Sequence, residues 1–426
     1  MDDRIGKLEA RLDHFDRGER DQALDDLARL VRSGRIRLPE PGPRVNLHAH
    51  SFFSYNALGY SPTHIVWRAR QEGLRAVGLV DFDLFDGIDE FFRAGEVLGI
   101  PTVAGMETRA YVPEFATREI TSPGEPGITY HIVTGLVRSA INDADAVRFA
   151  RMLRTSARRR NESVVERVNA HLDPVALDYE AQVLSLSPSG TPTERHLCLA
   201  YEKKAETVYP DPADRARFWA DRLGTPEPKV ADLLGDSRAL QALIRSRTMK
   251  RGGAGYQEPA PDTFPLMSDV NRFALAAGGI PTATWLDGTS RGEQDIDELL
   301  DLHVRAGAAA LNIIPDRNWN LTDPAVKDLK LANLYRIVEL AAARDLPLVV
   351  GTEMNAPGQK FVDDFDAPEL APVVDAFLRG ADVLVGHTAA VLDGEGGYLS
   401  DWAKGRFGTV AEKNAFFARR GRSWRR

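Results

Sequence analysis

Short apolar runs alternate with amphipathic helical patterns over much of the chain beyond residue 43. The runs read RVNLHAH, AVGLVDF, PTVAGMETRAYV, ITYHIVTGLV, GGIPTATWLDG, AAALNIIPDR, PLVVGTEMN and ADVLVGHTAA. The first helix between them is marked by Ser61 as its N-cap, Pro62 in its first turn and Gly73 at its end. Strands that alternate with helices in this way are typical of parallel sheets. We therefore predict a distorted βα-barrel of seven or eight parallel strands, with a doubly wound open sheet as the alternative.

The alternation is absent in two regions, which indicates how the chain is organised. Residues 1–34 carry apolar positions at helical spacing, and the segment LPEPGP that follows them cannot continue a helix. We expect an N-terminal helical extension over residues 1–38 and a barrel domain over residues 44–426. Between about 139 and 262 the chain is charged and mostly helical in pattern, which predicts a helical insertion within the barrel.

The composition narrows the choice of partner and compartment. The 426 residues carry a formal net charge of −8, which disfavours bulk nucleic-acid binding. Cys198 is the only cysteine, which excludes internal disulfides and a cysteine-based zinc site. The N-terminal sequence lacks the apolar core of a signal peptide, and no apolar run approaches the ~20 residues of a membrane span. We expect a cytoplasmic protein without a membrane partner.

Potential metal ligands gather at the carboxyl ends of the predicted strands. His48 and His50 end the first run, and residues two apart on a strand point to the same side. Glu107 ends PTVAGME, His131 lies within ITYHIVTGL, and Glu353 ends PLVVGTE. In a βα-barrel the carboxyl ends of the strands form the active-site face. Carboxylates and imidazoles that converge there without a cation would repel or desolvate one another, so the pattern predicts a divalent metal site.

The order of these motifs resembles that of the PHP family, the polymerase and histidinol phosphatase metallophosphoesterases. His48-Ala49-His50 is similar to the family's first motif, and Gly105-Met106-Glu107 to its Gly-x-Glu element. His131 is similar to its strand histidine, and His196 to the histidine of its Arg-Pro-His-Ile segment. Glu353-Met354-Asn355 is similar to its final Asp-x-His motif. The resemblance implies a metal-dependent hydrolase built on a distorted barrel.

The chain departs from the family at the positions that hold a third ion. Phe82 and Asn355 replace family histidines, and Tyr55 or Asn56 stands where the family often has His or Asp. The resemblance therefore implies that two divalent ions remain, with zinc, manganese or iron as the candidates. The first would be bound by His48, His50, Glu107 and Glu353, and the second by Glu107, His131 and His196.

Six further residues are candidates for catalysis or for binding the substrate. They are Asp81, Asp83, Arg109, Arg317, Lys360 and His387. The two aspartates could orient metal ligands or donate a proton to the leaving group, unless they serve only as a helix cap or turn. The three cations lie near strand ends, where they could bind phosphate, although each could equally be a surface residue. His387 follows ADVLVG within the last run, and it could contact the substrate or simply pack there.

The leading hypothesis is a phosphoesterase that acts on a small phosphorylated metabolite or nucleotide. Two ions ~3.5–4 Å apart would activate a bridging hydroxide for attack on phosphorus. One alternative is an amidohydrolase-type enzyme, which also has His-x-His on its first strand but usually needs a bridging lysine that these strand ends lack. Another is a non-catalytic metal- or ligand-binding protein of the same fold. Phe82 and Asn355 favour it, and so does Trp285, which stands in place of the histidine of the family's Ala-His-Pro segment.

Overall fold

The computed structural model describes residues 2–259 and 263–424, which divide into two compact units. Unit 1 consists of residues 1–52, 56–150 and 264–426, and unit 2 consists of residues 53–55 and 151–263. Every strand of the sheet belongs to unit 1. The structure of unit 1 therefore decides which strand-end residues meet.

The sheet has seven strands that neighbour one another in chain order. They are β1 (Val45–Ala49), β2 (Ala76–Phe82), β3 (Thr102–Tyr111), β4 (Ile128–Leu136), β5 (Ile280–Trp285), β6 (Ala310–Ile313) and β7 (Leu348–Val350). Neighbouring strands run parallel except at β4, which runs antiparallel to both β3 and β5. The predicted barrel is thus confirmed with seven strands, while the prediction that all of them are parallel was wrong for β4.

The sheet curls into a nearly closed barrel because the segment after β7 returns to β1. The backbone amide of Glu353 donates to the His48 carbonyl at 2.8 Å, and the amide of His50 donates to the Glu353 carbonyl at 2.8 Å. This close approach requires a glycine, since a Cβ at Gly351 would lie 2.4 Å from the His48 nitrogen. The alternative of an open sheet is therefore excluded.

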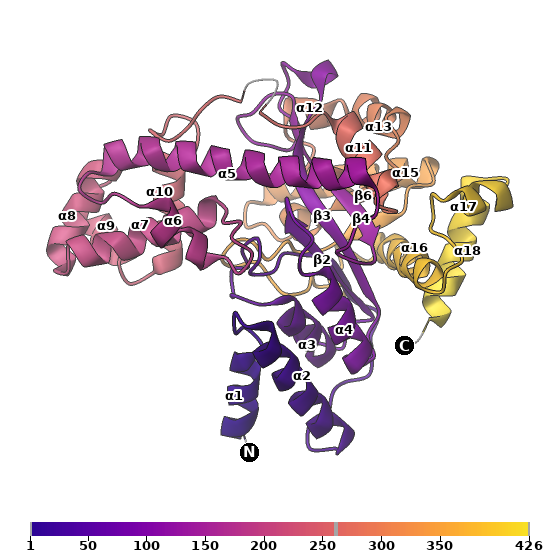
Figure 1. Ribbon diagram of the computed structural model, residues 1–426. Helices are drawn as coiled ribbons and strands as arrows, with labels where there is room; N and C mark the ends of the chain where they lie inside the picture. The colour runs from indigo at the N-terminus through magenta and orange to yellow at the C-terminus, as the bar shows by residue number, and fades with distance from the viewer. Residues whose placement is uncertain (1, 260–262, 425–426) are drawn as a thin grey trace. The chain divides into compact units, whose positions relative to one another are not determined.

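Helices make up most of the rest of unit 1 (Figure 1). They are α1 (Asp2–Arg11), α2 (Arg17–Arg32), α3 (Pro62–Gln71), α4 (Ile88–Leu98), the 3-10 helix η1 (Pro113–Phe115), α11 (Met267–Ala276), α12 (Arg291–Gln294), α13 (Ile296–Arg305), α14 (Asp316–Trp319), α15 (Pro324–Ala343), α16 (Val374–Leu392), α17 (Asp401–Arg406) and α18 (Val410–Ser423). Within the described residues, no helix combines the length and the apolar character needed to cross a bilayer.

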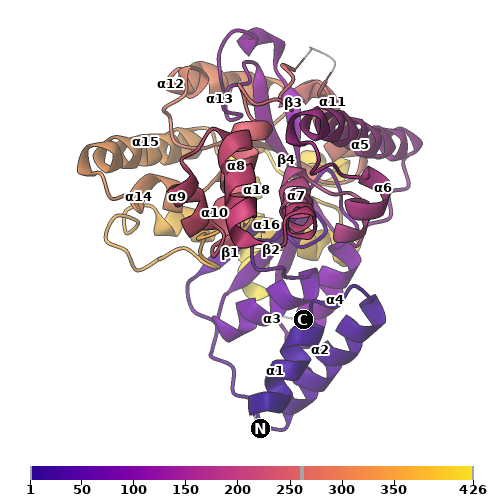
Figure 2. The same cartoon turned by 90° about the vertical axis from the view of Figure 1, so that its left-hand side faces the viewer.

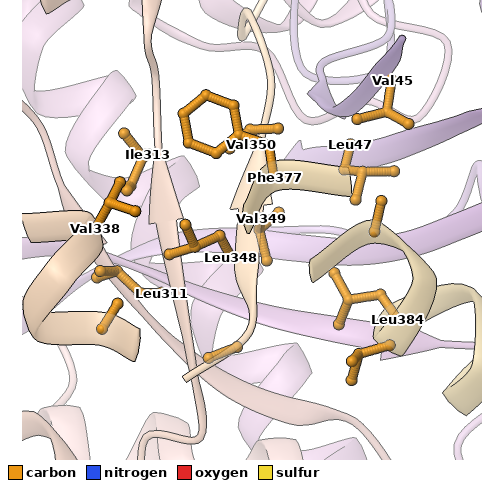
Figure 3. Close-up of a cluster of buried hydrophobic side chains, with 14 of the residues drawn as sticks. Val45, Leu47, Leu311, Ile313, Val338, Leu348, Val349, Val350, Phe377 and Leu384 are labelled. Atoms are coloured by element: carbon orange, nitrogen blue, oxygen red, sulfur yellow. The ribbon is translucent and has the colours of Figure 1, made fainter. Parts of the chain in front are cut away.

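Alternation along β1 separates an apolar face from a polar one. Val45 and Leu47 of β1 belong to a buried hydrophobic cluster with side chains of β6, β7 and α16, as Figure 3 shows. The alternate residues of β1, Asn46 and His48, point to the opposite side of the strand. There the His48 ring meets Asn312 of β6 across the barrel. The polar residues of the first motif therefore face the barrel interior.

The predicted eighth strand, ADVLVGHTAA, is instead part of helix α16. Every residue from Gly380 to Ala390 is buried, so this helix is apolar nearly all round. A short apolar run cannot be assigned to a buried strand or a buried helix by its periodicity alone. His387 consequently lies within a helix, and its predicted place at a strand end was wrong.

The N-terminal helices α1 and α2 belong to unit 1, where Figures 1 and 2 show α2 beside α3 and α4. Arg20 of α2 is 2% exposed, and its Nε donates to Glu90 Oε1 of α4 at 2.8 Å. The same guanidinium donates to the carbonyls of His14 and Phe15, and Glu90 also accepts from the Thr63 hydroxyl at 2.7 Å. A buried and well-bonded ion pair therefore fastens the extension to the barrel.

Unit 2 is helical, in agreement with the insertion predicted in this region. Its helices are α6 (Tyr179–Gln182), the 3-10 helix η2 (Leu184–Leu186), α7 (Glu194–Val208), α8 (Pro212–Leu223), α9 (Glu227–Leu233) and α10 (Ser237–Thr248), and α5 (Ala144–Leu172) contributes residues to both units. They bury a core of their own that includes Cys198, Tyr201, Trp219 and Ile244. The lone cysteine is thus a packing residue.

Candidate metal site

Two imidazoles and one carboxylate meet inside the barrel, and we call them the His–Glu group. His48 and His50 lie on and just after β1, and Glu107 lies on β3 beside Phe82, the last residue of β2. The Nε2 atoms of His48 and His50 are 3.3 Å apart, and Glu107 Oε2 lies 3.9 Å from the first and 3.3 Å from the second. All three side chains are buried, and among the described residues their donor atoms lie within 4.8 Å of one another.

Burial makes the charged forms of this group costly. It raises the pKa of Glu107 to about 8, although His48 opposes the rise. It also lowers the pKa of His48 and of His50 from the ordinary value, in spite of the nearby carboxylates. Burial therefore favours neutral imidazoles, and the nitrogen and oxygen lone pairs of the group have no positive charge of the group beside them. A cation among them would favour the ionised carboxylate and the neutral imidazoles at the same time.

The donor set fits a divalent transition metal. Ligands bound at 2.0–2.2 Å in tetrahedral geometry lie about 3.4 Å apart. The three separations in the His–Glu group are 3.3, 3.3 and 3.9 Å. Imidazole nitrogen together with carboxylate oxygen suits zinc, manganese and iron. His48, His50 and Glu107 could therefore hold one ion.

Glu353 lies against the same strand but outside the closest group. It forms a bridge with Ala49, and both Glu353 and the following Met354 have left-handed backbones, with φ of 62° and 59°. Such conformations cost about 1–3 kcal/mol each outside glycine. Here Glu353 is held by its hydrogen bonds to His48 and His50, and Met354 by the bond from the Ala57 amide to its carbonyl. The Glu353 carboxylate interacts electrostatically with His48, His50 and Glu107, and it accepts from Gln359 Nε2 at 3.0 Å.

Two asparagines that the sequence analysis did not identify contact His48. Asn312 Oδ1 lies 3.0 Å from His48 Nδ1, and Asn46 Oδ1 accepts from the His48 amide at 3.1 Å. Both asparagines are fully buried. A polar residue inside the apolar run AAALNIIP was a signal in the sequence, because a buried amide is costly unless it is bonded.

Asp81 and Asp83 each hold the residue that follows a member of the His–Glu group. The carboxylate of Asp81 accepts from both the amide and the hydroxyl of Ser51, at 2.7 Å each. Asp83 accepts from the Thr108 hydroxyl at 2.6 Å, and its amide donates to the carbonyl of Glu107 at 2.8 Å. These contacts suit residues that orient the ligands, which is one of the roles considered from the sequence.

His131 is not brought to the His–Glu group. It pairs across the sheet with Thr108, whereas Glu107 pairs with Ile132, so the two candidate ligands occupy opposite faces of the sheet. The His131 ring instead contacts Asn271, with Nε2 2.6 Å from Oδ1, and lies parallel to the ring of His303. This placement argues against a shared ion between Glu107 and His131.

His196 belongs to unit 2, at the start of α7. Its Nδ1 accepts from the Thr193 amide at 3.0 Å, so this nitrogen serves as a helix cap. Its ring packs edge-on against Tyr55, with centroids 5.4 Å apart. Within unit 2, this hydrogen bond accounts for the position of His196 Nδ1 without a metal ion.

The three predicted phosphate-binding cations have different surroundings. Arg109 faces the same side of β3 as Glu107, and its Nη1 donates to Glu125 Oε2 at 2.8 Å. Arg317 is exposed on α14, and Lys360 is exposed with its Nζ 3.2 Å from Asp316. Of these three cations, Arg109 is the one that the strand geometry places on the same side of the sheet as the His–Glu group.

His387 has both ring nitrogens engaged by the backbone. Its Nε2 lies 2.8 Å from the Gly135 carbonyl, and its Nδ1 accepts from the Tyr398 amide at 2.9 Å. Burial lowers its pKa to about 4. These bonds give His387 a packing role, which was the alternative considered from the sequence.

No known family profile matches this chain. Error-prone DNA polymerases from Corynebacterium diphtheriae and Nocardia farcinica are 39% and 38% identical over 75 and 76 residues, which is 18% of this chain and 7% of each polymerase. A 5'-3' exoribonuclease from Haemophilus influenzae is 39% identical over 64 residues, which is 15% of this chain and 23% of the relative. The chain thus matches less than a quarter of each relative. Polymerases give the PHP family part of its name, so these matches agree with the resemblance seen in the motifs.

Among solved structures, an amidohydrolase from Chromobacterium violaceum with bound sulfate and no metal has a TM-score of 0.51 and 16% identity, over 78% of this chain and 96% of that one. A protein from Bifidobacterium adolescentis assigned as a metal-dependent phosphoesterase has a TM-score of 0.48 and 20% identity, over 80% and 98%. At these identities the first likeness shows a shared fold alone, and no argument rests on the second.

Proposed function

We propose that this chain, a divergent relative of the PHP family, is a hydrolase that cleaves a phosphate ester with the help of one divalent metal ion. The observation that carries the proposal is the buried convergence of His48, His50 and Glu107 at strand ends of a barrel. Enzymes of this architecture keep their active sites at that end of the strands. The donor separations and the mixture of imidazole and carboxylate support a metal ligand role.

The side chains of the group would divide the work of binding. Neutral His48 and His50 and an ionised Glu107 would hold the ion, with Glu353 as a fourth candidate ligand. Asp81 and Asp83 would keep these ligands in place through the residues that follow them. When bound, a divalent ion would act as a Lewis acid and lower the pKa of a water molecule.

A phosphate ester is favoured as the substrate by two observations. The matched exoribonuclease is, by its name, an enzyme that cleaves phosphodiesters, and the motif order resembles that of metallophosphoesterases. In addition, Arg109 would offer positive charge to a phosphate on the same side of β3 as Glu107. An amidohydrolase is the second candidate, since a protein of that name shares the fold.

The placement of His131 favours one bound ion rather than the two expected from the motifs. The second ion would have needed Glu107 and His131 together, and these side chains leave opposite faces of the sheet. His131 Nε2 is already bonded to Asn271. We therefore propose a single ion at the His–Glu group.

Metal content and hydrolysis test the proposal together. The protein would be purified without added metal or chelator beside a His48→Ala, His50→Ala double variant. His14→Ala serves as the matched control, because this imidazole is exposed and lies in the N-terminal extension. Elemental analysis is expected to give about one transition-metal ion per chain in the wild type and the control, and none in the double variant. Phosphomonoesters, phosphodiesters and dipeptides would then be offered to each protein.

Each outcome of the screen has a distinct meaning. Hydrolysis of a phosphate ester that is lost in the double variant would support the proposal. Hydrolysis of the dipeptides alone would favour the amidohydrolase. Bound metal without hydrolysis of any compound would indicate a binding protein, and two ions per chain would revive the second site. Absence of metal even after reconstitution would overturn the proposal.

A further inference from the structure

Asn312 of β6 faces the barrel interior and reaches the His48 ring. Its Oδ1 lies 3.0 Å from His48 Nδ1, and both residues are 0% exposed. The other nitrogen of His48, Nε2, is the atom that approaches His50 and Glu107. Asn312 therefore contacts the imidazole on the side away from the rest of the group.

This contact selects one tautomer of His48. In this orientation of the Asn312 amide the carbonyl oxygen faces Nδ1 and can only accept a hydrogen bond, which places the proton of the neutral imidazole on Nδ1. The lone pair is then on Nε2, which is the nitrogen that would bind an ion in the His–Glu group. A hydrogen bond to the other ring nitrogen also fixes the plane of the ring.

The amide nitrogen of Asn312 shows that this contact is retained at a cost. Among the described residues, Asn312 Nδ2 is buried without a hydrogen-bond partner. A buried donor left unpaired lowers the stability of the fold, and a leucine of similar size would avoid that loss. Residues that break a local rule of this kind tend to lie at functional sites.

We propose that Asn312 is a positioning residue that holds His48 in the Nδ1-protonated tautomer and so prepares Nε2 for a divalent metal ion. The metal part of this inference rests on the proposed function, whereas the tautomer part does not. Asn312 would not touch the ion or the substrate, and its effect would pass through the His48 ring.

Three variants separate this role from a general effect on packing. Asn312→Leu removes the acceptor, and Asn312→Asp keeps an acceptor at the same place. Asn318→Leu is the matched control, because Asn318 is also fully buried with one unpartnered atom but bonds only to the Leu286 and Ile314 carbonyls. Zinc affinity of the metal-free proteins would be measured by competition with a chromophoric chelator. Nitrogen NMR of histidine-labelled protein, with His48→Gln to assign the signal, would report the tautomer.

The expected results differ between the variants. Asn312→Leu should weaken zinc binding roughly 10–100-fold, as loss of an outer hydrogen bond does at other metal sites. Asn312→Asp should restore binding to within a few-fold of the wild type, and Asn318→Leu should leave it unchanged. His48 should be protonated on Nδ1 in the wild type and lose that preference in Asn312→Leu.

Two results would overturn the inference. One is a wild-type His48 protonated on Nε2, and the other is zinc binding by Asn312→Leu that equals that of the wild type. If the wild-type protein binds no zinc at all, the proposed function fails, while the NMR signal of His48 still decides whether Asn312 sets the tautomer. The two failures are therefore distinguishable.

Discussion

His303 is a buried imidazole that lacks hydrogen bonds among the described residues. It is 1% exposed, neither ring nitrogen has a partner, and its ring lies parallel to that of His131 at 5.8 Å. Burial and the neighbouring His131 lower its pKa to about 3, against an ordinary value of 6.5. Between these two pH values the unfolded chain binds a proton that the folded chain does not, so the stability that depends on neutral His303 is lost as the pH falls.

We expect His303→Leu to stabilise the protein, and to do so more in acid. At pH 7.5 removal of the unpartnered nitrogens should raise the free energy of unfolding by about 1 kcal/mol. At pH 5 the gain should be larger by about 2 kcal/mol, because the unfolded variant no longer takes up this proton. Urea unfolding of the metal-free protein at both values measures the difference.

His14→Leu provides the comparison for this experiment. Its imidazole is exposed in the N-terminal extension, and surface substitutions of this kind usually change stability by less than about 0.5 kcal/mol. A His303→Leu variant that is less stable than the wild type at both pH values would show that bound water or another group satisfies the ring.

The sequence indicated the first motif of the site but not every member of it. His48 and His50 share a side because one strand carries both, and this follows from spacing alone. Whether His131 and Glu107 share a side depends on the register between two strands, and a change of one residue reverses the answer. The sequence contains no local signal for that register, which is why His131 was grouped with Glu107. Asn312 did leave a signal, a polar residue inside an apolar run, but its contact with His48 joins two strands that are far apart in the sequence.

At the scale of elements, the contact of α2 with α4 depends on a buried charge pair. Arg20 and Glu90 are each 2% exposed, and the pair is supported by backbone carbonyls and by Thr63. We expect Arg20→Met to lower the free energy of unfolding by about 3–5 kcal/mol, because Glu90 would remain buried without its cation. Chemical denaturation measures the loss.

A second variant tests whether the charge is the cause. Adding Glu90→Gln to Arg20→Met should recover at least half of the lost stability, since the buried charge is then absent. Arg11→Met is the control, because Arg11 and Glu19 form a pair that is 38% and 48% exposed and should contribute under ~1 kcal/mol. Equal losses in Arg20→Met and Arg11→Met would refute the argument.

Two elements show where the hydrophobic pattern of the sequence does not determine the structure. The run at β4 alternates as any strand does, and alternation does not encode whether the strand runs parallel or antiparallel to its neighbours. The run at α16 is buried on all sides, so its helical period cannot be recognised from an alternation of apolar and polar faces. The other strands were predicted at their places because helical patterns with clear caps separate them.

At the scale of the whole molecule, the candidate ligands are divided between two units. His48, His50 and Glu107 belong to unit 1, and His196 belongs to unit 2, which has a core of its own. Binding of one ion stabilises the part of the chain that holds its ligands, by about 2.7 kcal/mol when the free ion is at 100 times its Kd. The distribution of this stabilisation therefore reveals which ligands are used.

We expect hydrogen exchange to slow in β1 and β3 when zinc is added, and to stay unchanged in α7. Mass spectrometry of peptic peptides, with and without zinc, measures both regions in one experiment. His48→Ala should abolish the effect in β1 and β3, whereas His196→Ala should leave it intact. If α7 gains protection as well, and His196→Ala removes that gain alone, then His196 binds a second ion and the one-ion proposal fails. Because each unit has its own core, a gain confined to unit 1 cannot be explained by general tightening of the chain.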